Sequence, residues 1–420
     1  MSILVSNSLA RGLRRERAVD TRTADRQWLH WAWLPVLAGL GLSLLGIAAI
    51  GTTEPVLAQR QFGFLIVGML AAAFVGAQQW RWMRRWGWLL FAVNLAFLVL
   101  LLIPFVPDSI VRPRNGARRW INLGALDFQP SELIKLTWVV AMAAWMRTTA
   151  NVKRFSGIIA TILVTLVPVA LIILQPDLDS ALLFAPVLLV MLLAAGARVK
   201  YLLIIACVAL ALAPCSYPLL KKHQRDRIDT LIAQVLGDTR LNSGNGFQSS
   251  RAVTLAAAGG IVGSGKQESR ALIHYNRLPE EHTDMIFAVI VCRWGLLGGL
   301  ALWALAAMYA FGAFMVGVRA GTMFGRLVAV GIGAMVFLQL MVNTGMTIGV
   351  LPVSGMTLPF VSYGGSSLVC LWITTVSCLR WLAGVPGALT STPRMHLIDA
   401  SHVAPATSFA PEPHKSRHSY

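Results

Sequence analysis

Long apolar runs recur along this chain, and they constrain its fold more than any other feature. A run of about eighteen such residues in a helix crosses the ~30 Å hydrocarbon layer of a bilayer. Inside that layer a helix satisfies all of its own backbone hydrogen bonds. The sequence therefore predicts an all-α polytopic membrane protein with about ten transmembrane helices. They are expected near Trp33–Ile50, Gly63–Ala77, Trp88–Val106, Leu133–Met146, Gly157–Leu174, Ala181–Ala197, Tyr201–Leu219, Met285–Val318, Leu327–Gly349 and Leu368–Ala383.

Composition agrees with a membrane protein. Of the 420 residues, 56% are hydrophobic and 13% are charged, and the charged share is about half of the ~25% found in soluble domains. The first thirty residues are polar and rich in arginine, without a short apolar core before a small-residue cleavage site. We therefore expect no removable signal peptide.

Basic residues predict the orientation of the spans. They cluster before the first span and after the second, fourth, sixth and eighth, so the positive-inside rule places these connections and both termini in the cytoplasm. The predicted parts are a basic segment 1–30, a transmembrane domain 31–385 and a disordered tail 386–420. One large extracytoplasmic loop, 221–283, is expected between the seventh and eighth helices. A short outer loop breaks the rule with four arginines, Arg112, Arg114, Arg118 and Arg119.

Four polar segments marked by glycine and proline fall on the predicted outer side. They read "NGARRWINLGALDFQPSELIKL" from Asn115, "QPDLDS" from Gln175, "LPEEHTD" from Leu278 and "LPVSGMTLPFVSYGGSS" from Leu351. Their placement predicts a site at the outer membrane surface. A lipid-linked phosphate substrate would be bound there by arginines, because guanidinium groups match phosphate with two parallel hydrogen bonds. The membrane surface thus accounts for the basic excess, and no nucleic-acid partner is expected.

Each of these motifs also has a purely structural interpretation. Arg118 and Arg119 could extend to anionic lipid headgroups. Glu132 and Lys135 share a helix face and could form a structural ion pair, although ionisable groups within spans are usually functional. Asp284 could cap the eighth helix. "SYGGSS" could be a flexible turn, and the proline of "QPDLDS" could simply end a helix.

Two patterns do not indicate sites. Gly260–Gln267 reads "GIVGSGKQ" and resembles a phosphate-binding loop, but Gln267 stands where magnesium binding requires a hydroxyl. We therefore predict no nucleotide site. His274 and His282 have no further ligand cluster beside them, so a structural zinc site is not expected. The five cysteines lie in or beside spans and form no disulfide framework.

Taken together, the four segments resemble the SEDS family of bacterial cell-wall proteins, which includes RodA, FtsW and SpoVE. The segments carrying the likeness are "GARRWINLG", "FQPSELIKL", "QPDL", "LPEEHTDMIFAVI" and "NTGMTIGVLPVSGMTLPFVSYGGSS". The similarity runs from the first span to the tenth, and the last segment is slightly closer to the RodA branch. The resemblance implies a peptidoglycan glycosyltransferase that polymerises lipid II at the outer face of the cytoplasmic membrane, for elongation and shape or for division.

The resemblance also implies roles for individual residues. Asp284 matches the family's essential aspartate and would be the catalytic base, since an inverting transfer with a good leaving group needs one base. Arg118, Arg119 and Lys135 would hold the pyrophosphates, with Glu132 paired to Lys135. Glu280 and Glu281 would be neighbours on the rim. Further substrate-binding positions carried by the motifs are Asp177, His282, Ser362, Tyr363, Gly364 and Gly365.

Partners follow from the same resemblance. They are lipid II, the surrounding membrane lipids and a single-pass class B penicillin-binding protein. No cofactor is certain, and metal dependence is left open, including a divalent cation. Alternative functions are a lipid II flippase or a non-catalytic scaffold of a wall-building complex. Transporters place their polar site near the midplane on broken helices, whereas these motifs gather on one side.

Two departures from the family pattern keep the scaffold alternative open. Cys292 and Arg293 stand where relatives usually carry two glutamates, and Asp179 stands where glycine is usual. The span that contains Arg293, Met285–Val318, is longer than a bilayer requires, and Gly295–Gly317 alone could cross. We predict that Arg293 pairs with Asp179. The alternative is that Arg293 bonds backbone carbonyls or water.

Overall fold

The computed structural model describes residues 31–77, 80–109, 111–114, 117–122, 124, 127–148, 150–219, 222–235 and 245–383. The chain divides into two units, Met1–Gly384 and Val385–Tyr420, and all described residues belong to the first. The predicted basic segment 1–30 and the predicted tail 386–420 lie outside the described residues. Residues 236–244 of the predicted large loop lie outside them too.

Apolar helices dominate the described chain. Six are long and apolar enough to cross a membrane, namely Leu34–Thr53, Pro55–Ala77, Arg85–Leu102, Phe155–Leu174, Ile286–Arg319 and Met323–Thr347. Shorter apolar helical segments are Leu178–Ala194, Val199–Val208 and Gly365–Ser377. The predicted all-α polytopic membrane class is therefore confirmed, while the number of ten spans remains a prediction.

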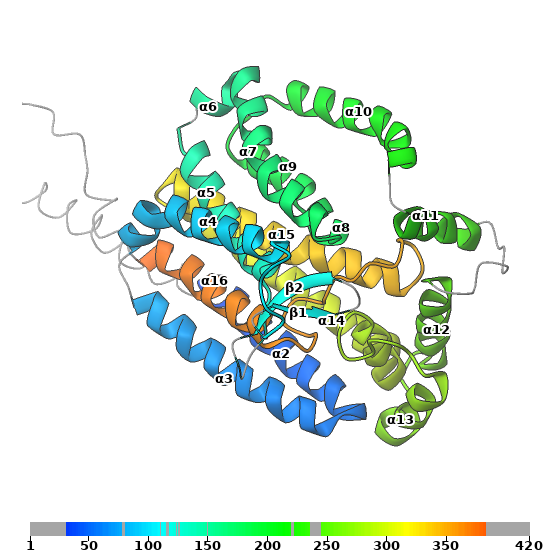
Figure 1. Cartoon of the computed structure of the whole chain (residues 1–420). Coiled ribbons are helices and arrows are strands. Elements are labelled where there is room, and N and C mark those ends of the chain that lie inside the picture. The colour runs from blue at the N-terminus through cyan, green and yellow to red at the C-terminus, as the bar shows by residue number, and fades with distance from the viewer. Residues whose placement is uncertain are drawn as a thin grey trace, which may run out of the picture. The chain divides into compact units, whose positions relative to one another are not determined.

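The first group of helices comprises α2 (Leu34–Thr53), α3 (Pro55–Ala77), α14 (Ile286–Arg319) and α16 (Gly365–Ala383). We call this group the α14 half. Within it α16 packs against α3 and α14 packs against α2 (Figure 1). Its core contains Leu42, Leu302 and Trp372. A glycine permits one close approach, because a Cβ at Gly46 would lie 2.3 Å from the carbonyl oxygen of Val361.

The second group comprises α4 (Trp80–Leu102), α5 (Pro130–Met146), α7 (Phe155–Leu174), α8 (Leu178–Leu182) and α9 (Phe184–Ala194). We call it the α5 half. Pro130 begins α5, where its missing N–H is not needed. Trp138 of α5 and Phe184 of α9 meet edge to face in the core, with ring centroids 4.8 Å apart. This geometry is favourable for aromatic pairs.

Helix α15 (Met323–Thr347) joins the two halves. Thr322 caps its start by accepting a hydrogen bond from the N–H of Gly325 at 3.2 Å. Residues nearer that start, such as Leu327 and Ile332, belong to the core of the α5 half. Leu340 and Met346, nearer its end, belong to the core of the α14 half. Gln339 of α15 contacts both sides, since it accepts a hydrogen bond from Lys135 of α5 and donates one to the carbonyl of Thr357.

A small antiparallel sheet follows α4, and the sequence analysis did not predict it. Its three strands are β1 (Val111–Arg114), β2 (Ala117–Asn122) and β3 (Asp127–Phe128), in that order. Ile121 pairs with both Val111 and Phe128 in the ladder and packs with Leu101 at the end of α4. Such short strands give too little periodicity to be separated from a loop by sequence pattern.

The remaining helices are α6 (Ala150–Lys153), α10 (Val199–Ser216), the 3₁₀ turn η1 (Tyr217–Leu219), α11 (Lys222–Val235), α12 (Asn245–Ala258) and α13 (Gly265–Asn276). Helices α12 and α13 both contact α14 (Figure 1). Helix α14 has 34 residues and is interrupted at Gly295, whose φ of 67° and ψ of −162° are not helical. The break separates Ile286–Trp294 from Gly295–Arg319, which is about 37 Å long and sufficient to cross a bilayer.

Candidate active site

Asp284 lies in the turn directly before α14, and main-chain contacts hold this turn. The hydroxyl of Ser362 donates to the carbonyl of Thr283 at 2.5 Å, and the N–H of Tyr363 donates to the carbonyl of His282 at 2.9 Å. The amide of Asn343 donates to the carbonyl of Asp284 itself at 2.8 Å. Met285 is the N-cap residue of α14, so Asp284 is not the helix cap that one interpretation of the sequence allowed.

The segment after α15 brings a second carboxylate close to Asp284. The N–H of Gly355 donates to Oδ2 of Asp179 at 2.9 Å. A Cβ on Gly355 would lie 3.7 Å from Oδ2 of Asp284 and 3.8 Å from Oδ2 of Asp179. The two carboxylates therefore flank Gly355, and a side chain at this position would enter the space between them.

Two amides of α15, one helical turn apart, hold the same segment. Gln339 donates to the carbonyl of Thr357 at 2.9 Å, and Asn343 donates to the carbonyl of Met356 at 2.6 Å. Asn343 has no exposed surface. Because Asn343 also binds the carbonyl of Asp284, it ties the turn before α14 to the segment after α15. Sequence reasoning did not single out either amide.

The motif "SYGG" is held by a residue that the sequence analysis missed. Gln61 of α3 is 1% exposed. Its amide nitrogen donates to the carbonyl of Ser362 at 3.0 Å, and its amide oxygen accepts from the N–H of Gly364 at 3.1 Å. Tyr363 packs its ring near those of Phe64 and His282. The predicted span began at Gly63, so Gln61 fell outside it beside Gln59 and Arg60, and no sequence pattern distinguished it from these neighbours.

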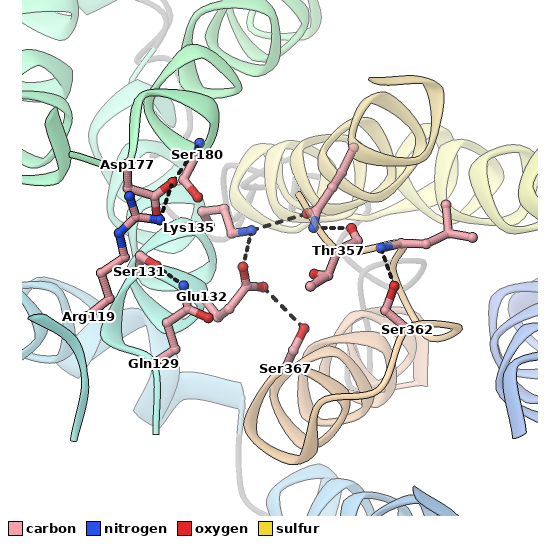
Figure 2. A network of polar contacts seen from close by, with 12 residues as sticks. Arg119, Gln129, Ser131, Glu132, Lys135, Asp177, Ser180, Thr357, Ser362 and Ser367 are labelled. Atoms are coloured by element: carbon pink, nitrogen blue, oxygen red, sulfur yellow. Dashed lines mark hydrogen bonds and ion pairs between the residues drawn. The ribbon is translucent and has the colours of Figure 1, made fainter. Parts of the chain in front are cut away.

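Glu132 and Lys135 form the predicted pair. Nζ of Lys135 lies 2.7 Å from Oε1 of Glu132 and donates to Gln339 at 3.2 Å, while Ser367 donates to Oε2 of Glu132 at 3.2 Å (Figure 2). The side chains of Lys135 and Glu132 are 3% and 11% exposed. The pair thus links α5 to α15 and to the start of α16.

Arg119 connects the sheet to the segment "QPDLDS". It donates to the carbonyls of Gln175, at 3.0 Å, and of Pro176. Its guanidinium also lies 3.8 Å from Oδ1 of Asp177 (Figure 2). Its neighbour Arg118 turns to the end of α4. There it donates to the carbonyls of Pro104, at 2.8 Å, and of Val106, with Asp108 at 3.7 Å. Both arginines therefore have protein partners, and their side chains keep 21% and 25% exposure.

Asp177 is a buried cap residue rather than an open ligand. Its carboxylate accepts from the N–H of Ser180 at 3.4 Å at the start of α8. Burial raises the pKa of Asp177 above its ordinary value, and the nearby charge of Arg119 opposes part of that rise. In the turn before α14, burial likewise raises the pKa of Glu281, while a hydrogen bond with Thr53 opposes that rise.

The predicted pairing of Arg293 with Asp179 is wrong. Arg293 donates to the carbonyl of Ala48 at 2.5 Å and to Oγ1 of Thr52 at 2.9 Å, both on α2, and its guanidinium stacks 4.2 Å from the Trp294 ring centroid. Asp179 accepts from Gly355 instead. The alternative, a backbone carbonyl partner, is confirmed. Sequence spacing did not reveal that Arg293 projects toward α2.

The four predicted motif segments meet through a continuous series of contacts. Arg119 joins the first segment to the second, and Asp179 joins the second to the fourth. Ser362 joins the fourth to the third, and Glu132 bonds to Ser367 of the fourth. Within the described ranges no group of three or more acidic, histidine or cysteine side chains could hold a metal ion. The arrangement offers carboxylates for proton transfer and arginines for anion binding.

These features define a polytopic membrane protein with one polar site between two helical halves. The FtsW/RodA/SpoVE family model, described as cell cycle protein, matches residues 22–380. The chain belongs to this family and is an integral protein of the bacterial inner membrane.

Several relatives are similar over most of their length. Stage V sporulation protein E of Bacillus subtilis is 33% identical over 75% of this chain and 83% of its own. A probable peptidoglycan glycosyltransferase FtsW of Coxiella burnetii is 31% identical over 83% of this chain and 95% of its own. These matches and those to solved structures include SpoVE, FtsW and RodA, so a closer tie to RodA remains a prediction.

Solved structures share the fold. One, described as structural coordination of polymerization and crosslinking by a peptidoglycan synthase complex, matches with a TM-score of 0.71 and 29% identity. The match covers 84% of this chain and 97% of that one. The rod shape determining protein RodA of Thermus thermophilus matches with a TM-score of 0.60 and 26% identity, over 84% of this chain and 96% of its own.

Proposed function

We propose that this protein is a peptidoglycan glycosyltransferase that polymerises lipid II at the outer face of the inner membrane. The observation that carries the proposal is the series of contacts that links all four motif segments, with the carboxylates of Asp284 and Asp179 on either side of Gly355. The relatives named as probable peptidoglycan glycosyltransferases support the reaction class. The orientation, with the motif segments outside and both termini in the cytoplasm, follows from the basic connections.

Asp284 is the proposed base. Its carboxylate takes the proton from the acceptor hydroxyl as that oxygen bonds to the anomeric carbon of the donor sugar. The bond from this carbon to the pyrophosphate oxygen breaks, and the electron pair leaves with undecaprenyl pyrophosphate. The product is inverted at the anomeric carbon, and no covalent enzyme intermediate is needed.

Arg118 and Arg119 are the proposed phosphate ligands. Both retain exposed surface and now donate to backbone carbonyls, which phosphate oxygens can replace as stronger charge-assisted acceptors. Lys135 is 2% exposed, so we assign it an indirect role, in which it holds Glu132 and Gln339 in position rather than contacting phosphate. The remaining proposed substrate-binding residues are His282, Ser362, Tyr363, Gly364 and Gly365. Asp177 holds Arg119 in position.

The departures at Cys292 and Arg293 do not remove these groups. Arg293 is bound to α2 and Cys292 is fully buried, and within the described chain neither residue bonds to Ser362, Tyr363 or Asn343, which hold the turn of Asp284. A polymerisation assay separates the enzyme from the scaffold alternative.

The decisive experiment is polymerisation of lipid II by the purified protein, measured as glycan chain length on a gel. Asp284→Asn should lower the rate by about 10²-fold or more while leaving thermal stability unchanged, since the side chains are nearly isosteric. The matched control is Glu280→Gln, an exposed carboxylate in the same turn. Near-normal polymerisation by Asp284→Asn would show that Asp284 is not the base. If the wild-type protein itself does not polymerise lipid II, the flippase or the scaffold is favoured.

The proposed partner is a class B penicillin-binding protein that crosslinks the new strands. The similar solved structure described as a peptidoglycan synthase complex supports such an assembly. Affinity purification from native membranes should recover this partner in stoichiometric amount. Recovery of the active polymerase alone would contradict the partnership without touching the proposed reaction.

A further inference from the structure

Helices α12 and α13 form a hairpin whose turn, Gly259–Ser264, we call the hairpin tip. The open end of the hairpin is closed by reciprocal bonds. Arg251 donates to the carbonyl of Asn276, and the Asn276 amide donates to the carbonyl of Arg251 at 2.8 Å. The hairpin tip lies at the other end, where α14 is broken.

The hairpin tip is bonded into the break of α14. Where Gly295 interrupts the helix, the N–H of Leu296 donates to the carbonyl of Gly260 at 2.9 Å, and that of Leu297 donates to the carbonyl of Ile261 at 3.2 Å. In return the N–H of Ser264 donates to the carbonyl of Cys292 at 3.0 Å. The tip therefore replaces hydrogen bonds that the broken helix cannot make with itself.

Glycines make this contact close and fix its geometry. A Cβ at Gly259 would lie 2.0 Å from the carbonyl oxygen of Val291, and one at Gly263 would lie 2.2 Å from that of Arg293. Gly263 also has a φ of 93°, which side chains rarely adopt. The hairpin tip consequently has one position along α14, set by main-chain contacts on both sides.

The hairpin tip exposes two large apolar side chains. Ile261 is 68% exposed and Val262 is 75% exposed. Their neighbours on α14 are Leu296, Leu297 and Leu300, each more than half exposed. These leucines belong to Gly295–Arg319, the part of α14 with the length of a bilayer span, so their exposed surface faces acyl chains. Because Ile261 bonds directly to Leu297, the tip lies at the same depth as the first turn of this span.

Four of the six backbone N–H groups of the hairpin tip have main-chain partners, whereas those of Ile261 and Val262 have none in the described chain. A polar group left without a partner in the membrane interior costs several kcal/mol. The N–H groups of Gly259, Gly260 and Gly263 donate to the carbonyls of Ala256, Ala257 and Gly259, and that of Ser264 donates to Cys292. Trp294, one residue before the break and stacked under Arg293, is of the type that marks the membrane–water boundary.

We infer that the hairpin tip is a lipid anchor, with Ile261 and Val262 inserted among the acyl chains of the leaflet where Gly295–Arg319 begins. The partner is membrane lipid, and the contact extends the lipid-facing surface of α14 onto a loop that does not span. Since the tip is bonded to α14 shortly after Asp284, the anchor also fixes the height of Asp284 above the hydrocarbon. That consequence rests on the proposed function, whereas the insertion itself does not.

Photochemical crosslinking tests the insertion. A diazirine-bearing amino acid is placed at position 262 of the full-length chain in phospholipid nanodiscs, and adducts are identified by mass spectrometry. The matched control is position 275 on α13, because Tyr275 is 88% exposed and lies near the other end of the hairpin. We expect at least about fivefold more phospholipid adduct at position 262 than at position 275.

Equal adduct yields at the two positions would overturn the inference, and so would adducts at position 262 formed with a second copy of the chain. Polymerisation of lipid II by the same crosslinking variants is measured in parallel. An inactive protein that still forms the lipid adduct would count against the proposed function alone, and an active protein without the adduct would count against the anchor alone.

Discussion

The two halves of the bundle hold their share of the site by different means. In the α5 half and the small sheet that contacts it, charged side chains bind one another or nearby carbonyls, as Lys135 does with Glu132 and Arg119 with Asp177. In the α14 half, neutral side chains hold main-chain groups, as Gln61 does at Ser362 and Gly364. Each half contributes what the proposed reaction requires, cations from one and the base from the other.

The difference indicates how each half responds to substitution. A buried charge pair is sensitive to loss of one partner, because the other charge is then left without compensation. A segment held by its backbone is sensitive to added volume and to loss of the amides that satisfy it. Helix α15 takes part in both arrangements, since Gln339 accepts from Lys135 and donates to Thr357.

The largest effect is expected from Lys135→Met in the α5 half. The variant leaves the largely buried carboxylate of Glu132 with Ser367 as its one remaining hydrogen-bond donor among the described residues, at a cost of about 3–5 kcal/mol in the free energy of unfolding. Thermal unfolding in detergent measures the loss. The double variant Glu132→Gln with Lys135→Met should recover most of it, and Lys153→Met, on an exposed lysine, should change little. A single variant as stable as the wild type would show that the pair is not what holds this half.

The corresponding test for the α14 half adds a methyl group at Gly46, where a helix lies against the backbone of the segment that carries Ser362. In Gly46→Ala the new methyl group would lie 2.3 Å from the carbonyl oxygen of Val361, so the segment carrying Ser362 must shift, at about 1–3 kcal/mol. We expect lower thermal stability and slower polymerisation together. The control is Gly63→Ala on α3, where no atom lies within 4 Å of the new group. Equal behaviour of the two variants would mean that the close approach at Gly46 is not a constraint.

Loss of an amide gives an effect no larger than that of added volume in the same half. Gln61→Ala removes both bonds to the "SYGG" segment and leaves buried backbone groups unsatisfied, at about 1–3 kcal/mol. Gln59→Ala is the matched control, because Gln59 is exposed on the same helix. Polymerisation at saturating lipid II should fall for the first variant only. If both variants behave alike, Gln61 does not position this segment.

The sequence allowed the α5 half to be predicted better than the α14 half, for a physical reason. Hydropathy locates spans in both, and the spacing of Glu132 and Lys135 on one helix face predicts their contact directly. The partners of Gln61 are about 300 positions away, so local periodicity contains no information about them. Asn343 lies inside a motif, but only the fold reveals that it binds the carbonyl of Asp284.

The sequence also could not predict in which direction a side chain projects from its helix. The length of the predicted eighth span implied that Gly295–Gly317 alone could cross, and the structure places a break at Gly295. The direction of Arg293, however, depends on how α14 is rotated against α2. A compensating pair with Asp179 was a reasonable hypothesis from two departures, yet Asp179 instead holds the backbone of Gly355.

The smallest expected effect concerns Asp177, and it distinguishes charge pairing from burial in the α5 half. Burial raises the pKa of Asp177 above its ordinary value of 3.8, despite Arg119 nearby. The folded state therefore binds this proton more tightly than the unfolded state does. The contribution of Asp177 to the free energy of unfolding is therefore most favourable below pH 3.8, and it is lost as the pH rises through the folded pKa. Thermal unfolding of the wild type and of Asp177→Asn is compared across this range. The wild type should lose stability relative to the variant as the pH rises. A relative gain instead would show that attraction to Arg119 outweighs burial, which would make Asp177 resemble Glu132 in its dependence on a cationic partner.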